Sequence, residues 1–176
     1  MKKFSNISKK KLFIFIIVVV VIVGFIVLCC LRISNQNSIF YRNAQKSFSM
    51  LNQATQHGNT TFVAVPKKFS NGEELAKYFS NGMAVPNNGK KIILENGVVY
   101  QFEASGDCFD KKCFVIIDLN GTKQKPNKYW KVSSKPSDRI VMYIGRIKNK
   151  QSDKLQVIKP QQIQQGVKIG IRTRNK

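Results

Sequence analysis

The sequence predicts an α+β protein in which a long N-terminal helix, half transmembrane and half soluble, packs on a small antiparallel β-sheet. Residues 12–31 form a run of 20 residues without a charged or strongly polar side chain. Residues 34–56 follow without Pro or Gly and repeat apolar side chains at helical spacing. From residue 91 onward, short β-branched runs alternate with turn residues. Because a small sheet is not stable alone, we expect the helix at 34–56 to cover it.

The apolar run at 12–31 is predicted to cross a membrane as a helix. Twenty residues at about 1.5 Å each reach roughly 30 Å, the thickness of the hydrocarbon core. A buried core helix of this length would carry a polar face. A cleaved signal has a shorter apolar core, about 7–15 residues, that ends at a small-x-small site. Residues 27–31 provide no such site, so we expect an uncleaved anchor in contact with membrane lipid.

Charge on the two sides of the run predicts its orientation, because positive charge stays on the cytoplasmic side. We expect residues 1–11 in the cytoplasm, an extracytoplasmic head at 32–160 and a polar, loosely held tail at 161–176. The protein would then be a single-pass protein of the inner or cytoplasmic membrane. Residues 32–176 carry 25 of the 30 basic residues and all nine acids, a net charge of +16. Only Arg32 follows the run closely, whereas five lysines precede it: Lys2, Lys3, Lys9, Lys10 and Lys11.

Cys29 and Cys30 lie at the outer end of the run. Two small apolar side chains that fill a helix face explain them most simply. Lipid attachment or an intermolecular bridge stays open, although Leu28 is not the small residue that a lipoprotein signal requires.

Two helices are predicted in the head. Gly58 follows the last periodic residue of the first, as a glycine often does at a helix end. A short helix at 73–79 follows a capping box formed by Ser70 and Glu73, and Asn81-Gly82 ends it. The apolar stripe of the first helix comprises Phe40, Ala44, Phe48 and Leu51, with Ala54 or Thr55 next.

The strands are predicted from β-branched runs and the turns between them. Residues 91–95 and 98–103 flank Asn96-Gly97, a pair that tolerates the positive φ angles of a type I′ hairpin turn. Further strands are predicted at 113–118, 139–145, 155–158 and 167–171.

Two motifs carry a resemblance to a known family. Residues 43–54 are similar to a Lys-aromatic-x-x-Leu-x-x-Ala helix, and residues 116–121 read Ile-Ile-Asp-Leu-Asn-Gly, followed by Pro126-Asn127. This second patch looks like a "DxNG…PN" loop that is followed by an Asp-led strand, here at 138–144. In this order the motifs resemble the type IV pilins and the pseudopilins of type II secretion. The resemblance implies a structural or interaction role, as a minor or assembly-modulating subunit that contacts other pilin-like subunits through the N-terminal helix.

One departure from the family concerns processing. Family members carry a Gly before the prepilin peptidase cut and a Glu shortly after it, which pairs with a neighbouring subunit. Residues 10–17 of this chain contain neither. A buried acid in lipid costs a few kcal/mol unless it is paired, so its absence removes the cost together with the assembly contact. We therefore expect the N-terminus to stay unprocessed.

Cys108 and Cys113 are predicted to form a disulfide. They lie outside the cytoplasm by the charge argument, where disulfides persist. A loop of six residues would contribute about 2 kcal/mol by the loop-entropy model. The alternative, a metal site with His57, is one ligand short.

The resemblance raises calcium as a cofactor, because some pseudopilins that this chain resembles bind calcium near the same loop. Asp118, Asn120, the Gly121 carbonyl and Asp138 offer the hard oxygen ligands that calcium takes. The alternative is an ordinary Asx-type turn. The positive charge of Lys123, Lys125 and Lys128 surrounds the loop.

The basic head suggests a second function, a membrane-tethered module that binds a polyanion. Lysines interleaved with aromatic residues are typical of proteins that bind single-stranded nucleic acid. Extracellular DNA or an acidic envelope polymer would be the partner, and the alternative is a solvated, Lys-rich surface. The candidate residues are Lys123, Lys125, Lys128, Trp130 and Lys131.

We do not expect an enzyme. One His makes a hydrolytic triad or a His-based metal cage improbable. The sequence contains no phosphate loop, nucleophile elbow or metalloprotease motif.

Overall fold

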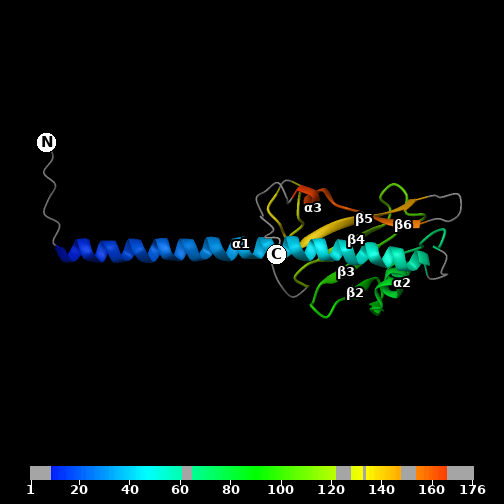
Figure 1. Ribbon diagram of the computed structural model, residues 1–176, viewed down its shortest axis with the longest axis horizontal. Coiled ribbons are helices and arrows are strands. Elements are labelled where there is room, and N and C mark those ends of the chain that lie inside the picture. Colours follow the sequence, from blue (N-terminus) through cyan, green and yellow to red (C-terminus); the bar gives the residue numbers. More distant parts are fainter. Residues whose placement is uncertain (1–8, 61–64, 122–127, 133, 148–153, 166–176) are drawn as a thin grey trace. The chain divides into compact units, whose positions relative to one another are not determined.

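The computed structural model describes residues 9–60, 65–121, 128–132, 134–147 and 154–165 (Figure 1). It confirms the α+β fold. The chain divides into two units, Met1–Gln36 and Asn37–Lys176. The elements are α1 (Lys9–Thr60), α2 (Gly72–Met83), β1 (Asn87–Asn88), β2 (Lys91–Ile93), β3 (Val99–Glu103), β4 (Phe114–Asp118), β5 (Arg139–Ile147), β6 (Lys154–Ile158) and α3 (Gln161–Gln165).

The first unit contains the apolar part of α1. Among the described residues, one helix is long and apolar enough to cross a membrane by length and composition, and it covers Phe13–Gln56 with a mean hydropathy of 3.6 in its most apolar window. Its large apolar side chains from Phe13 to Ile33 are exposed. The predicted apolar helix is therefore present. Its end was predicted four residues early, at residue 56, since α1 continues through Gly58 to Thr60.

The second half of α1 supplies the centre of the head. Ala44, Leu51 and Ala54 are at most 1% exposed, as the periodicity predicted. Tyr41 and Ser47 are also buried, whereas Phe40 and Phe48 are only partly covered, so the buried face is rotated from the predicted one.

Hydrogen bonds explain why polar groups lie on this face. The Tyr100 hydroxyl donates to Ser47 Oγ at 3.0 Å, and the Tyr41 hydroxyl donates to the Ile163 carbonyl at 2.9 Å. A buried hydroxyl is tolerated when it has such a partner. Burial also raises the pKa of the Tyr100 hydroxyl.

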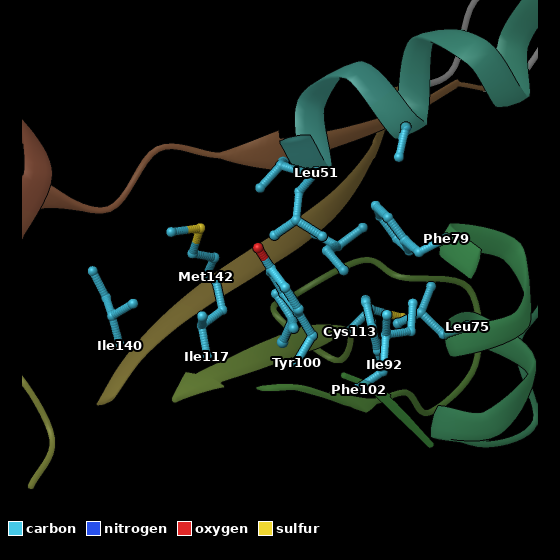
Figure 2. Close-up of a cluster of buried hydrophobic side chains, with 14 of the residues drawn as sticks. Leu51, Leu75, Phe79, Ile92, Tyr100, Phe102, Cys113, Ile117, Ile140 and Met142 are labelled. Atoms are coloured by element: carbon cyan, nitrogen blue, oxygen red, sulfur yellow. The ribbon is translucent and has the colours of Figure 1, made fainter. Parts of the chain in front are cut away.

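The six strands form one sheet in the order β1-β2-β3-β4-β5-β6, with every neighbouring pair antiparallel. The register pairs Tyr100 with Ile117 and Ile117 with Ile140, so large side chains line up across three strands. Figure 2 shows these side chains beneath Leu51 of α1, together with Phe79 of α2. Alternation along each strand thus produces one apolar layer that α1 and α2 cover.

The hairpin turn differs from the prediction. The Gly97 N–H donates to the Leu94 carbonyl at 2.9 Å, and the Leu94 N–H donates to the Val98 carbonyl at 3.0 Å. Gly97 has φ of +82°, but Asn96 has no positive φ, so the type I′ turn is wrong. The loop is instead the longer kind in which one left-handed glycine closes the hairpin.

The N-cap of α2 lies one residue after the predicted cap, Ser70, and the helix begins at Gly72, one residue before the predicted start. Asn71 is the N-cap, and its side chain accepts from the backbone N–H groups of Glu73 and Glu74. Glu74 accepts in return from the Ser70 N–H at 2.7 Å. The prediction also ended α2 too early, because Gly82 is helical and lets α2 approach α1: a Cβ there would lie 2.6 Å from the Ala54 carbonyl oxygen.

The predicted polar tail begins with ordered structure. Gln161–Gln165 form α3, and Ile163 is 1% exposed, because its side chain joins the core while its carbonyl accepts from Tyr41. The strand predicted at 167–171 lies outside the described residues. Strand β1 was not predicted, since Asn87-Asn88 carries no β-branched signal.

Truncating Leu51 tests whether α1 is the centre of the head. Leu51→Ala should lower the free energy of unfolding by about 2–5 kcal/mol, because the lost apolar contacts and the cavity add. Gln53→Ala is the control on the same helix, since Gln53 is exposed, and it should change stability by less than about 0.5 kcal/mol. Denaturant unfolding of the full chain in detergent measures both. Equal small effects would contradict the packing of α1 in the core.

Candidate functional site

The residues predicted around the loop after β4 lie on neighbouring segments. β4 ends at Asp118, and the Leu119 N–H donates to the Asp138 carbonyl just before β5 at 2.7 Å. Asp118 is 5% exposed and Asp138 is fully buried. The structure thus brings the two predicted acids into one region, with Asn120 half-buried after them.

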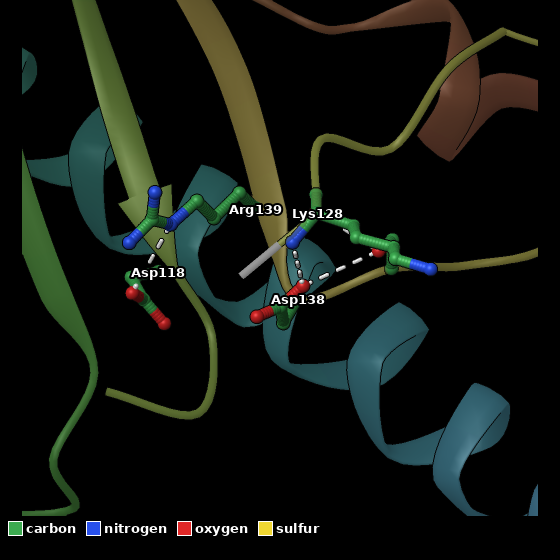
Figure 3. A network of polar contacts seen from close by, with 5 residues as sticks. Asp118, Lys128, Asp138 and Arg139 are labelled. Atoms are coloured by element: carbon green, nitrogen blue, oxygen red, sulfur yellow. Dashed lines mark hydrogen bonds and ion pairs between the residues drawn. The ribbon is translucent and has the colours of Figure 1, made fainter. Parts of the chain in front are cut away.

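Asp118 has a cationic partner. Its Oδ2 lies 3.4 Å from Nε of Arg139, as Figure 3 shows, and the side chains are 7% and 29% exposed. Its Oδ1 is buried and has no hydrogen-bond partner among the described residues. The pair lies on adjacent strands, because Asp118 and Arg139 are register partners. Burying a carboxylate is costly unless it has a cationic or hydrogen-bonding partner, and Arg139 is that partner here.

Asp138 binds the segment that begins at Lys128. Its Oδ1 accepts from the Lys128 N–H at 2.8 Å and from the Ser137 hydroxyl at 3.3 Å (Figure 3). The Arg139 N–H donates to the Lys128 carbonyl at 3.0 Å, and the Trp130 N–H donates to the Arg139 carbonyl at 2.7 Å. These bonds fix Lys128–Trp130 alongside the start of β5.

The donor set fits calcium poorly. Arg139 already supplies positive charge to Asp118, and one oxygen of Asp138 is engaged with two donors. Calcium usually takes six to eight oxygen ligands without a competing guanidinium. Among the described residues, no group of three or more His, Cys, Asp or Glu side chains is placed to hold a metal ion. The calcium site at Asp118, Asn120 and Asp138 stays a prediction from the resemblance.

Trp130 is not the stacking surface that a nucleic-acid site would need. It is 5% exposed, its ring packs edge-on against Tyr41 with centroids 6.2 Å apart, and its Nε1 donates to the Ser134 carbonyl at 3.3 Å. The ring contributes to the core and offers no exposed face for stacking, and the polyanion site itself stays a prediction. Lys128 and Lys131 are exposed, and Lys123 and Lys125 lie outside the described residues.

The predicted disulfide is confirmed. Cys108 and Cys113 are bonded, with Cα atoms 4.8 Å apart, and both residues are buried. The small loop between them is tight, since Asp110 and Lys111 have φ of +55° and +63°. Cys29 and Cys30 are free and exposed.

A buried arginine next to this loop was not predicted. Arg146 is 7% exposed, its Nε donates to the Asp107 carbonyl at 2.8 Å, and its Nη2 donates to the Pro66 carbonyl. It therefore ties the segment after α1 to the disulfide loop. Strict alternation along β5 could have revealed it, because Arg146 continues the inward series Ile140, Met142 and Ile144.

A groove of about 560 Å³ lies elsewhere, between α1 and the β2–β3 hairpin. Its walls are mostly apolar, with Met50, Val85 and Leu94, while Lys46 and Glu95 supply its charges. None of the predicted site residues lines it.

No family model, curated protein or solved structure matches the chain at a significant level.

Removing the arginine of the Asp118 pair tests its structural role. Arg139→Met should lower the free energy of unfolding by about 2 kcal/mol, less than for a fully buried pair because Arg139 is partly exposed. The double variant Asp118→Leu/Arg139→Met should recover much of this loss, since neither charge of the pair is then left without the other. Denaturant unfolding measures these two variants and Asp118→Leu alone. If the double variant is as unstable as the sum of the two single changes, the two side chains do not act as a pair.

Proposed function

We propose that this chain is a single-pass, pilin-like structural protein of a bacterial envelope, with a cytoplasmic N-terminus and an extracytoplasmic head. The observation that carries the proposal is the composition of α1. This one helix contains the apolar stretch that starts at Phe13 and also the face that buries Ala44 and Leu51 against the sheet. The pilin resemblance implies this arrangement, in which the first half of one helix anchors the chain and the second half packs in the core of the head.

The loop after β4 supports the proposal from a different direction. The Asp-Leu-Asn-Gly motif begins at the last residue of β4, and Gly121 takes φ of +82°. A Cβ at Gly121 would lie 2.7 Å from the Gly97 carbonyl oxygen, so the motif needs glycine there. Asp138, which leads the next strand, binds the returning chain at the Lys128 N–H. The motif residues thus shape this turn and bind the segment that returns to β5.

The disulfide supports an extracytoplasmic head. Cys108 and Cys113 lie in a tight loop, and disulfides of this kind persist outside the reducing cytoplasm. The lysines before α1 favour the same orientation by the positive-inside rule.

The N-terminal sequence restricts the role within such a system. Lys11 stands where a Gly would precede the peptidase cut, and no Glu follows in residues 12–17. A subunit that is not cut and has no such acid would not enter a filament by the ordinary route. We therefore propose an unprocessed minor or assembly-modulating subunit, which contacts other pilin-like subunits through α1.

Restoring the processing motif tests the proposal. The native chain, expressed with a prepilin peptidase, should keep its full intact mass. The variant Lys11→Gly/Ile16→Glu should lose residues 1–11, because it regains both features that the peptidase and the assembly contact require. Ile16→Glu alone is the control and should stay uncut.

Intact-mass measurement on membrane-extracted protein separates the outcomes. Loss of residues 1–11 from the native chain would show that it is processed after all. A restored variant that stays uncut, while an authentic prepilin is cut in the same cells, would contradict the pilin-like assignment.

A further inference from the structure

A cationic turn with exposed apolar side chains lies between β4 and β5. We call Lys128, Tyr129, Lys131, Val132 and Lys135 the basic turn. All five residues are exposed, and Tyr129 and Val132 keep 50% and 46% of their surface accessible. The basic turn therefore presents two apolar side chains to solvent among three lysines.

The basic turn is held in place from within. Trp130 lies in its middle and packs on Tyr41, and its carbonyl accepts from Gln162 Nε2 at 3.0 Å. Ser134 closes the turn through its N–H, which donates to the Lys131 carbonyl at 3.2 Å. With Trp130 pinned in the core, its neighbours Tyr129 and Lys131 point outward. The turn therefore presents its side chains from a fixed backbone.

No acid offsets this charge along the turn. Residues 119–137 contain no Asp or Glu, so the nearest acids in sequence are Asp118 and Asp138. Both are buried, Asp118 beside Arg139 and Asp138 against the Lys128 N–H. The turn thus offers cations to a partner without a competing carboxylate on its own segment.

The length of the connecting chain limits how far the head can lie from the proposed membrane anchor. Tyr41 lies ten positions after Leu31, the last residue of the apolar run. Trp130, in the middle of the basic turn, packs on Tyr41. Even fully extended, ten residues reach only about 35 Å, whatever angle the two units adopt. A patch tethered this closely meets the bilayer surface at high effective concentration.

We propose that the basic turn binds the anionic surface of the membrane that anchors the chain. The lysines would contact lipid phosphates, and Tyr129 and Val132 would enter the headgroup region, where tyrosine is favoured. The inference rests on the membrane anchoring proposed above and adds a second, reversible contact. A polyanion in solution is the rival ligand. For base stacking it would have Tyr129 alone, because Trp130 is buried. The tether to the proposed anchor favours lipid over a polyanion that diffuses freely.

Trp130 provides the readout, because it is the only tryptophan of the chain and lies inside the basic turn. The full chain is reconstituted in nanodiscs of phosphatidylcholine, with or without phosphatidylglycerol, that carry a spin label on some phosphatidylcholine headgroups. Quenching of Trp130 should be stronger in the anionic discs and should fall at high salt, since surface charge is then screened.

Charge removal locates the contact. The triple variant Lys128→Gln/Lys131→Gln/Lys135→Gln should shift the docking equilibrium roughly 100-fold toward the free head, because each lysine near an anionic surface is worth roughly fivefold. Its quenching in anionic discs should therefore fall to the level of neutral discs. Lys67→Gln/Lys68→Gln/Lys77→Gln is the matched control, which loses the same charge from exposed lysines elsewhere and should keep native quenching.

The outcomes separate this inference from the proposed function. Failure to insert into discs of either composition would overturn both. Insertion with equal quenching in the two compositions would overturn only the lipid contact. Loss of quenching in both triple variants alike would show general charge attraction rather than a site. Binding of a single-stranded oligonucleotide to neutral discs, lost in the first triple variant, together with no effect of phosphatidylglycerol, would assign the turn to polyanions in solution.

Discussion

The burial of one face of α1 against the sheet is the interaction on which the rest of the head depends. The strands form a simple antiparallel order, and their inward side chains need a cover to leave water. Leu51 and Ala54 provide that cover from α1, and Gly82 lets α2 come close to the same helix. Because the covering element is the second half of α1, which also contains the apolar stretch from Phe13, the proposed anchoring and the folding of the head involve the same helix.

Buried polar side chains also hold loop segments of the head in place. Arg146 ties the segment after α1 to the disulfide loop, and Asp138 ties the segment before β5 to Lys128. Both are buried side chains that bind backbone groups, which would otherwise lose their hydrogen bonds to water. The result is a loop region held from inside, with lysines and a tyrosine on its outer side.

The sequence predicted those features that depend on periodicity or on spacing. The apolar helix, the main strands and the bond between Cys108 and Cys113 belong to this class. Features set by tertiary partners were missed. Tyr41 and Ser47 look like surface residues until Ile163 and Tyr100 supply their hydrogen bonds. Trp130 reads as an exposed aromatic among lysines, yet Tyr41 buries it, and Gly82 reads as a helix end until α1 approaches.

Hydrogen exchange on the full chain in nanodiscs tests the central claim most directly. If α1 is the core of the head, the amides from Tyr41 to Ala54 and those of β3, β4 and β5 should open together. They should then show the same free energy of exchange and the same dependence on denaturant. Exchange of the helix amides at a clearly lower free energy, while the sheet stays protected, would contradict the account, because the sheet would then be stable without its cover.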